Sequence, residues 1–317
     1  MKQTTRFALM AAACATLFYT ACTKQDAPSN ADQTSPRAVT AKSGPISVMY
    51  VEVNNNNLLN VGCYSLKKSG APFFDYAIIF AANINYDATA HKAVLYNNPN
   101  VTKVLTNKAT YIQPLQAKGI KVTLSILGNH QGAGIGNFTS RAAAADFAQQ
   151  LADAVNTYGL DGIDFDDEYA DYGNNGLPQP NDSSLILLLS ELRSRLPGKT
   201  ISIYNIGVAA SYGSYGGHTI GEYANYAWNP YYGSYSVPAT PGLTKAQKGP
   251  AAVDVTSTSS STSTSFAQRT VSDGYGVMLF YNLTQTSIAS YLQGTSKALY
   301  NDSVVAPAGC SQPWTSQ

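Results

Sequence analysis

Charged side chains are scarce in this 317-residue sequence, where Asp, Glu, Lys and Arg together make up 12%, against about 25% in a typical soluble domain. The formal net charge is only +1, which argues against nucleic acid or an anionic membrane surface as a partner, because such partners select a basic footprint. Apolar residues, at 44%, suffice for a sizeable core and exclude a wholly disordered chain. A surface poor in charge and rich in Tyr suits an exported protein that handles neutral ligands such as sugars.

Histidine and cysteine are also few. The three histidines stand far apart, without the spacing of a metal site, at positions 91, 130 and 218, so we expect no metal. Two of the four cysteines lie in the N-terminal segment, which leaves Cys63 and Cys310 in the body. Those two are either isolated thiols or a disulfide that ties the tail to the first helix region, and the sequence leaves both possibilities open.

Long apolar runs are absent beyond the N-terminus, so no other segment reaches the ~18 residues of a membrane-spanning helix. Lys2 and Arg6 precede the short apolar run Phe7–Tyr19, as in an export signal. Ala21-Cys22 then resembles a bacterial lipoprotein processing site, so we predict a signal peptide over 1–21 and lipidation of Cys22. The protein is then an exported cell-envelope lipoprotein, periplasmic or surface-exposed. An ordinary signal peptide and secretion are the alternative.

Polar residues 22–44, with Pro and Ser and no periodicity, predict a flexible tether. Residues 45–303 predict a single α/β domain, an irregular (β/α)8 barrel of TIM type, because short apolar runs alternate with helical patterns. Residues 304–317 are predicted to form a C-terminal tail. The eight expected strands are Ile46–Val53, Tyr76–Phe80, Val122–Leu127, Gly162–Phe165, Ile201–Tyr204, Tyr226–Trp228, Ala251–Val255 and Tyr275–Tyr281.

Helices are predicted over Val101–Lys118, Arg141–Tyr158 and Ser183–Leu196, the last of which stops before Pro197. Two stretches, 206–224 and 234–248, show no helical period, so some outer helices should be missing or replaced by loops. The Ser/Thr-rich segment Val255–Ser265 predicts a flexible surface loop.

The segment that follows Leu160 carries the chemistry: Asp-Gly-Ile-Asp-Phe-Asp-Asp-Glu over residues 161–168. In a strand, alternation places Ile163 and Phe165 on one face and Asp164, Asp166 and Glu168 on the other, with successive carboxylates about 6.6 Å apart at the backbone. Burying three like charges raises at least one carboxyl pKa, as a general acid at neutral pH requires. The segment lacks the Gly and Glu positions of a calcium loop.

This octapeptide resembles the DGxDxDxE signature of glycoside hydrolase family 18. Five other segments are similar to the endo-β-N-acetylglucosaminidases of that family, and the likeness runs from about residue 44 to 300. These segments are 50–56, 79–87, 127–134, 169–176 and 227–233. The signature alone is shared with chitinases and with inactive lectins, whereas the combination is more specific.

The resemblance implies an irregular barrel enzyme that hydrolyses the GlcNAc-β1,4-GlcNAc core of high-mannose and hybrid N-linked glycans and leaves one GlcNAc on Asn. It implies retention through an oxazolinium formed by the substrate's own acetamido group. By motif position Glu168 is the general acid and base, Asp166 orients the acetamido group, and Asp164 and Asp161 support Asp166. Tyr204 is placed to hydrogen-bond the acetamido carbonyl.

Further positions at strand ends are candidates for substrate binding, because barrel active sites lie at the C-terminal ends of strands. Tyr281 stands where many family members have Trp. The Gly-rich loop 128–136 resembles a glycan-contacting loop, and it has no phosphate-loop Lys-Ser/Thr pair, so we expect no nucleotide cofactor. The candidates are Asn129, His130, Gln131, Trp228, Asn229, Tyr231 and Tyr281.

Two other functions compete with the glycoprotein endoglycosidase. A chitinase would act on chito-oligosaccharides, but no segment is long enough for the insertion domain that deepens many chitinase grooves. A non-hydrolytic glycan-binding barrel usually lacks the final acid of the signature, which is present here as Glu168. We therefore expect N-linked glycans as the partner, no cofactor, no nucleic acid, membrane contact only through the lipid, and a monomer.

Overall fold

The computed structural model describes residues 42–317. The predicted signal peptide, Cys22 and most of the predicted tether lie outside the described residues. Within residues 42–317, no helix is both long and apolar enough to cross a membrane.

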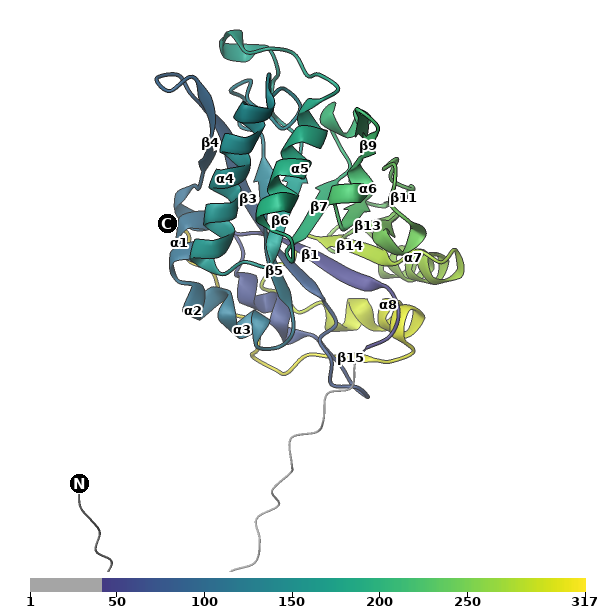
Figure 1. Cartoon of the computed structure of the whole chain (residues 1–317). Coiled ribbons are helices and arrows are strands. Elements are labelled where there is room, and N and C mark those ends of the chain that lie inside the picture. Colours follow the sequence, from purple (N-terminus) through teal and green to yellow (C-terminus); the bar gives the residue numbers. More distant parts are fainter. Residues whose placement is uncertain (1–41) are drawn as a thin grey trace, which may run out of the picture. The chain divides into compact units, whose positions relative to one another are not determined.

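Parallel strands form the wall of a barrel (Figure 1). Its strands are β1 (Ile46–Glu52), β3 (Tyr76–Asp87), β5 (Lys121–Leu127), β6 (Gly162–Asp166), β7 (Thr200–Tyr204), β10 (Tyr226–Trp228), β12 (Lys248–Gly249), β13 (Ala251–Asp254) and β14 (Val277–Tyr281). Neighbours pair in the order β14-β1-β3-β5-β6-β7-β10-β12. Only Pro250 separates β12 from β13, and β13 pairs with β14, so the pairing continues around the ring. The irregular TIM-type barrel is confirmed.

Two apolar layers sandwich the barrel wall. Alternate residues such as Tyr50, Trp228 and Leu279 fill the interior, and the intervening residues, such as Ile163 and Phe165, pack outward against the helices. A parallel strand covered on both faces needs this near-continuous apolar pattern, which is why the strand positions could be predicted.

Helices cover the barrel unevenly. The longer ones are α4 (Arg141–Tyr158), α5 (Ser184–Arg195), α7 (Ser260–Ser272) and α8 (Ala289–Tyr300). Ser140 caps the start of α4 through its side chain, and Gly159 ends α4 at φ +70°, as helix termini require. Only a 3-10 turn (Leu58–Cys63) follows β1, a gap that the sequence did not predict. The two stretches predicted to lack helices contain no helix longer than one turn: 206–224 has a 3-10 turn (Ala209–Ser211) and the one-turn α6 (Ile220–Tyr223), and 234–248 has a 3-10 turn (Lys245–Gln247). The predicted gaps in the outer helical layer are thus present.

Two local expectations are corrected. The helix predicted over Val101–Lys118 is three short helices, namely α1 (Pro99–Thr106), α2 (Lys108–Tyr111) and α3 (Gln113–Gln116). Asn107 leaves helical geometry at φ −98°, ψ 43°, and Pro114 has no N–H for a continuous ladder. The segment predicted as a flexible loop over Val255–Ser265 instead enters α7, because the Ser259 side chain caps the N–H of Thr262.

Shorter elements decorate the barrel. They are β2 (Ser65–Leu66), β4 (Lys92–Tyr96), β8 (Ser214–Tyr215), β9 (His218–Thr219), β11 (Ser234–Tyr235), β15 (Val304–Val305) and 3-10 turns at Asn174–Gly176, Ala209–Ser211 and Lys245–Gln247. Strand β4 pairs antiparallel with the extended end of β3 and forms a hairpin beyond the barrel wall.

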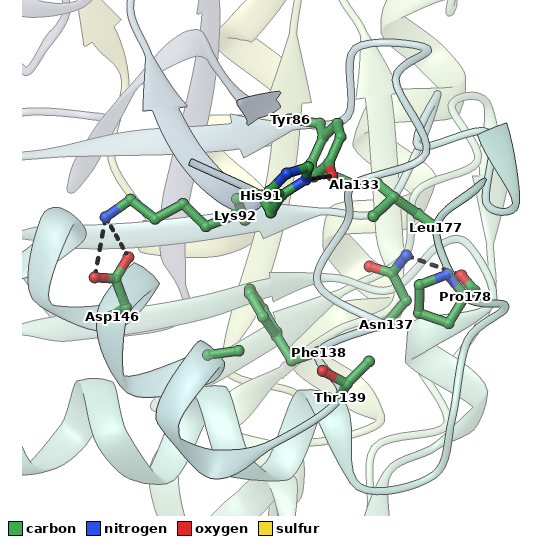
Figure 2. Close-up of a pocket in the computed structure, with 12 residues that line it drawn as sticks. Tyr86, His91, Lys92, Ala133, Asn137, Phe138, Thr139, Asp146, Leu177 and Pro178 are labelled. Carbon is green, nitrogen blue, oxygen red and sulfur yellow. Dashed lines mark hydrogen bonds and ion pairs between the residues drawn. The ribbon is translucent and has the colours of Figure 1, made fainter. Parts of the chain in front are cut away.

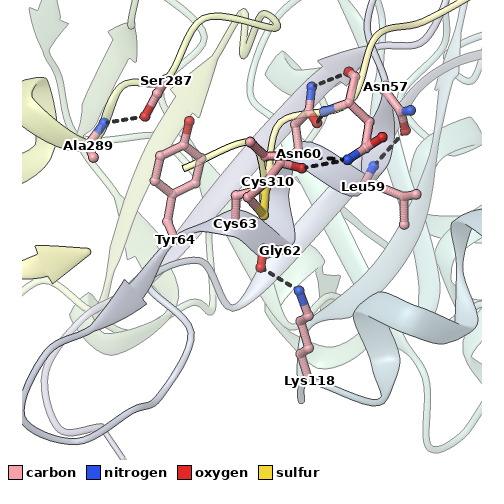
Figure 3. The surroundings of a disulfide bond; sticks show 12 residues. Asn57, Leu59, Asn60, Gly62, Cys63, Tyr64, Lys118, Ser287, Ala289 and Cys310 are labelled. Atoms are coloured by element: carbon pink, nitrogen blue, oxygen red, sulfur yellow. Dashed lines mark hydrogen bonds between the residues drawn. A yellow bond between two sulfur atoms is a disulfide. The ribbon is translucent and has the colours of Figure 1, made fainter. Parts of the chain in front are cut away.

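The C-terminal tail is packed against the body. Cys63 and Cys310 form a disulfide (Figure 3), which resolves the alternative that the sequence left open. Strand β15 pairs with β2. The Trp314 ring lies edge-on to Tyr111, with centroids 5.5 Å apart. The tail therefore closes over the outside of the first elements of the barrel.

The chain enters the barrel at the N-terminal end of its strands. Lys42 forms an ion pair with Asp75, at 2.7 Å, and its side chain is only 7% exposed. Its ammonium lies 4.4 Å from the centroid of the Tyr300 ring. Lys42, which the sequence assigned to the flexible tether, is therefore held in place at the start of the barrel.

Candidate active site

Strand β6 carries a buried carboxylate at the centre of the barrel. Asp164 points inward and accepts hydrogen bonds from three other strands: from the Tyr50 hydroxyl of β1 at 2.6 Å, the Ser125 hydroxyl of β5 at 2.8 Å and the Ser202 hydroxyl of β7 at 2.7 Å. Burial raises the pKa of Asp164 to about 6, although the three donors pull it down. Three hydroxyls converging on one carboxylate fix its position.

Asp166 and Glu168 follow Asp164 in the sequence, at and just beyond the C-terminal end of β6. Asp166 ends β6, is 2% exposed, and accepts the N–H of Glu168 at 3.0 Å. Burial raises the pKa of Asp166 well above its ordinary value, and the neighbouring charges of Glu168 and Asp164 raise it further. Burial also raises the pKa of Glu168. These carboxyls therefore hold protons to higher pH than free ones do, which general acid catalysis requires.

Tyr50 links the carboxylates to the aromatic interior. Its hydroxyl donates to Asp164 and accepts the indole N–H of Trp228 at 2.8 Å. Trp228 is 1% exposed, so this candidate substrate-binding residue is part of the barrel interior and supports Tyr50. Sequence reasoning did not single out Tyr50, because nothing in β1 reveals which strand will face an Asp on β6.

Aromatic rings line the interior beside Asp166. Tyr281 stacks on Tyr232, with centroids 4.9 Å apart and planes 17° from parallel. The Tyr204 hydroxyl donates to the Pro230 carbonyl at 2.7 Å. Tyr232 therefore belongs to the site, although no sequence pattern marked it. The candidate next to it, Tyr231, is 61% exposed and lies on the surface.

Asn229 is not available to a ligand. Its amide donates to the Ser234 carbonyl, the Ser234 hydroxyl and the Pro250 carbonyl, and its oxygen accepts the N–H of Tyr231. The side chain is 1% exposed. The structure thus gives Asn229 the task of shaping the loop after β10, which corrects its expected contact with substrate.

In the Gly-rich loop after β5, two of the predicted residues hold the loop in place and a third is exposed at its edge. Asn129 donates to the side chain of Asn85 at 2.9 Å, and Gln131 accepts the N–H of Tyr86 at 2.8 Å. Both therefore fasten the loop to the β3–β4 hairpin. His130 instead lies at the rim, 2.8 Å from the Asp171 carboxylate, with its imidazole 63% exposed.

Comparison with known proteins identifies the family. The glycosyl hydrolases family 18 profile matches residues 47–246, which is more than half of the chain. The chain belongs to glycoside hydrolase family 18.

Two curated proteins and one solved structure are similar to this chain over most or much of its length. The chain is 58% identical over 265 residues to an endo-beta-N-acetylglucosaminidase of Flavobacterium sp. (strain SK1022), covering 84% of this chain and 83% of the relative. It is 43% identical over 202 residues to endo-beta-N-acetylglucosaminidase F1 of Elizabethkingia meningoseptica, covering 62% and 59%. EndoBT-3987 of Bacteroides thetaiotamicron, solved in complex with Man9GlcNAc2Asn substrate, superposes with a TM-score of 0.76 at 29% identity, covering 88% of this chain and 72% of that one.

The acidic residues of the family 18 signature lie at two different places in the structure. Asp164, Asp166 and Glu168 follow the inward face of β6, but Asp161 lies before the strand begins. One of its carboxylate oxygens accepts from the Gln116 amide and from the N–H of Val122, both at 2.8 Å. The expectation that Asp161 supports Asp166 is therefore corrected, because Asp161 instead ties the N-terminal end of β6 to α3 and β5.

A separate cavity of about 170 Å³ lies outside this family 18 site (Figure 2). It opens between the β3–β4 hairpin, represented by Tyr86 and Lys92, and the segment before α4 that contains Asn137 and Phe138. Lys92 closes one side through its ion pair with Asp146 at 3.1 Å. The lining contains none of the β6 carboxylates, so this cavity is distinct from the site on β6.

Among residues 42–317, no group of three or more His, Cys, Asp or Glu side chains is arranged to hold a metal ion. The family 18 site offers carboxyl and hydroxyl groups from Asp164, Asp166, Glu168 and the tyrosines around them, at the C-terminal ends of the strands.

Proposed function

We propose that the chain is an endo-β-N-acetylglucosaminidase that cleaves the GlcNAc-β1,4-GlcNAc core of high-mannose and hybrid N-linked glycans and leaves one GlcNAc on Asn. The observation that carries this function is the chain of inward carboxyls, Asp164, Asp166 and Glu168, in a sequence 58% identical over 265 residues to an endo-beta-N-acetylglucosaminidase. The substrate in the EndoBT-3987 complex, Man9GlcNAc2Asn, contains the bond in question.

Glu168 protonates the leaving oxygen and then, as a carboxylate, removes a proton from the attacking water. Burial raises the pKa of Glu168 and so favours the protonated form that a general acid needs. In the first step the acetamido oxygen of the substrate attacks the anomeric carbon, the glycosidic bond breaks, and an oxazolinium forms. No carboxylate acts as the nucleophile, so the separation rule for two-carboxylate retaining enzymes does not apply.

Asp166 orients the acetamido group and stabilises its developing positive charge. Its burial strengthens this interaction, because a charge in a low-dielectric site is screened little by water. Asp164, held in place by three hydroxyls, precedes Asp166 on β6, and its negative charge helps to raise the pKa of Asp166. Because these carboxyls interact closely, their titration belongs to the set and not to single residues.

The aromatic residues and the rim provide the surfaces for sugar. The stacked Tyr232 and Tyr281 offer a flat apolar wall beside Asp166, and Tyr204 lies near it with its hydroxyl directed to Pro230. His130 and the exposed Tyr231 lie at the surface, where an extended glycan can contact them.

The protein acts outside the cytoplasm as a monomeric cell-envelope lipoprotein, anchored through Cys22. This part of the proposal rests on the short apolar run and Ala21-Cys22 at the N-terminus. Metabolic labelling with a radioactive fatty acid, beside a Cys22→Ala variant, tests it: label in the variant, or none in the wild type, rejects the anchor. Size-exclusion chromatography with light scattering on residues 42–317 tests the monomer.

Mass spectrometry of a high-mannose glycoprotein tests the activity. Incubation with the wild type should leave the protein with one GlcNAc per site, and Glu168→Gln should leave the glycan intact. If neither protein cuts, chito-oligosaccharides are the next substrate. Cleavage of those alone would favour a chitinase, and binding without cleavage of either would favour a non-hydrolytic barrel.

A further inference from the structure

The buried carboxylate of Asp167, next to the catalytic residues Asp166 and Glu168, has no part in the mechanism above. Asp167 stands between Asp166 and Glu168 in the sequence and is 7% exposed. Strand alternation turns its side chain away from the barrel interior. Its carboxylate accepts the Tyr172 hydroxyl on one oxygen and the N–H of Ala209, at 2.8 Å, on the other. Asp167 therefore joins the loop after β6 to the loop after β7.

Tyr172 extends this connection to a third loop. While its hydroxyl donates to Asp167, it accepts the N–H of Gly136 at 2.9 Å. Burial and the neighbouring Asp167 raise the pKa of the Tyr172 phenol, so the hydroxyl stays protonated and remains a donor. The loops after β5, β6 and β7 thus meet at one hydroxyl–carboxylate pair.

Two glycines lie against Asp167 and Tyr172, where a larger residue would meet one of them. Gly207 adopts φ +76°, and a Cβ there would lie 2.5 Å from the Asp167 carbonyl oxygen, closer than any side chain allows. A Cβ at Gly136 would lie 2.8 Å from the Tyr172 hydroxyl oxygen. A side chain at position 207 would therefore clash with the backbone of Asp167, and one at position 136 would displace the Tyr172 hydroxyl from its present place.

The same loops hold the main chain of Glu168. The N–H of Gly128 donates to the Glu168 carbonyl at 3.0 Å, and the N–H of Glu168 donates to Asp166. Among residues 42–317, no side chain or N–H donates to the Glu168 carboxylate, and burial alone shifts its pKa. The direction of this carboxyl therefore depends on how its backbone is fixed.

We propose that Asp167 and Tyr172 form a positioning pair that fixes the backbone of Glu168 relative to Asp166 by clamping the three loops together. This inference rests on the proposed function, since it assigns the general acid to Glu168. A displacement of about 1 Å in a catalytic group can cost on the order of 100-fold in rate, so a clamp at the adjacent residue affects turnover more than glycan binding.

The test compares Tyr172→Phe, Asp167→Asn and the double variant with wild type on a high-mannose glycopeptide. Tyr172→Phe keeps the ring and loses the shared hydroxyl. We expect each single variant to lose about 10- to 100-fold in kcat with KM within about twofold, and the double variant to lose no more than the worse single one. We also expect the alkaline limb of the kcat profile to move to lower pH, because water that reaches Glu168 lowers its raised pKa.

Tyr300→Phe is the matched control, because its hydroxyl donates to the Pro45 carbonyl at 2.9 Å at the opposite end of the barrel. If Tyr172→Phe and Asp167→Asn keep wild-type kcat and pH profile, or if Tyr300→Phe shows the same losses, the positioning pair is refuted. A wild type that releases no glycan instead refutes the proposed function. Thermal unfolding of each variant, with assays far below the midpoint, separates misfolding from misplacement, and Asp167→Asn serves if Tyr172→Phe fails to fold.

Discussion

Tyr50 offers a test of how the buried carboxylates are held, because one hydroxyl serves two buried partners. Tyr50→Phe removes the donor to Asp164 at 2.6 Å and the acceptor of the Trp228 indole N–H at 2.8 Å. The ring and its packing remain. The change therefore isolates the hydroxyl.

The expected magnitude follows from those two contacts. A hydrogen bond to a charged group contributes about 1.5–3 kcal/mol, and an unpaired buried N–H costs about 1–3 kcal/mol. Loss of the donor to ionised Asp164 raises its pKa further above the present value of about 6; at about 1.4 kcal/mol per pKa unit, this is a shift of about one to two units. The acidic limb of the kcat/KM profile should move to higher pH by that amount, since the carboxyl set gains its negative charge later. The free energy of unfolding near neutral pH should fall by about 3 kcal/mol.

The assay is the pH dependence of kcat/KM on a high-mannose glycopeptide, together with urea unfolding near neutral pH. Tyr76→Phe is the control, because its hydroxyl also lies in the barrel interior but contacts Thr200, at 3.0 Å, and no carboxylate of β6. An acidic limb of Tyr50→Phe that coincides with that of the wild type would refute the role assigned to this hydroxyl. So would an equal shift in Tyr76→Phe.

Other predictions address the same site and the tail. Glu168→Gln should lower kcat by at least about 1,000-fold with unchanged circular dichroism, and Asp166→Asn should be severely impaired; glycan release checks both. Because the native pKa of Asp164 is raised to about 6 from 3.8, the native state binds its proton more tightly than the unfolded state. Stability from this group is therefore lost as pH rises from about 4 to about 6, by up to about 3 kcal/mol, and Asp164→Asn should lack this slope in urea titrations. Cys310→Ser opens a crosslink that spans 247 residues and should lower the free energy of unfolding by roughly 3–5 kcal/mol in chemical denaturation.

The barrel could be predicted because local patterns determine much of it. The apolar runs that became β1, β5 and β14 are buried on both faces, and that requirement is visible in the sequence. The inward face of β6 could be predicted for the same reason, since alternation alone separates Asp164 and Asp166 from Phe165.

What could not be predicted depends on contacts between distant segments. Tyr50 and Ser202 reach Asp164 from strands 114 and 38 residues away, and no local pattern encodes that meeting. The choice of Tyr232 over Tyr231 depends on the loop after β10, which turns at Tyr232 and Gly233. The Ser/Thr-rich start of α7 has low helical propensity, yet it is helical because Ser263 packs against α8 and meets Thr295 at 2.8 Å.

Lys42 and Glu168 occupy opposite ends of the barrel: Lys42 pairs with Asp75 just before β3 begins, whereas Glu168 follows the last residue of β6. The chain upstream of Lys42 therefore joins the barrel at the end opposite to Glu168. A resin, a fused domain or a lipid attached there would be joined to the barrel at that opposite end. Immobilisation directly upstream of Lys42 should therefore leave the end of the barrel that carries Glu168 accessible to large substrates.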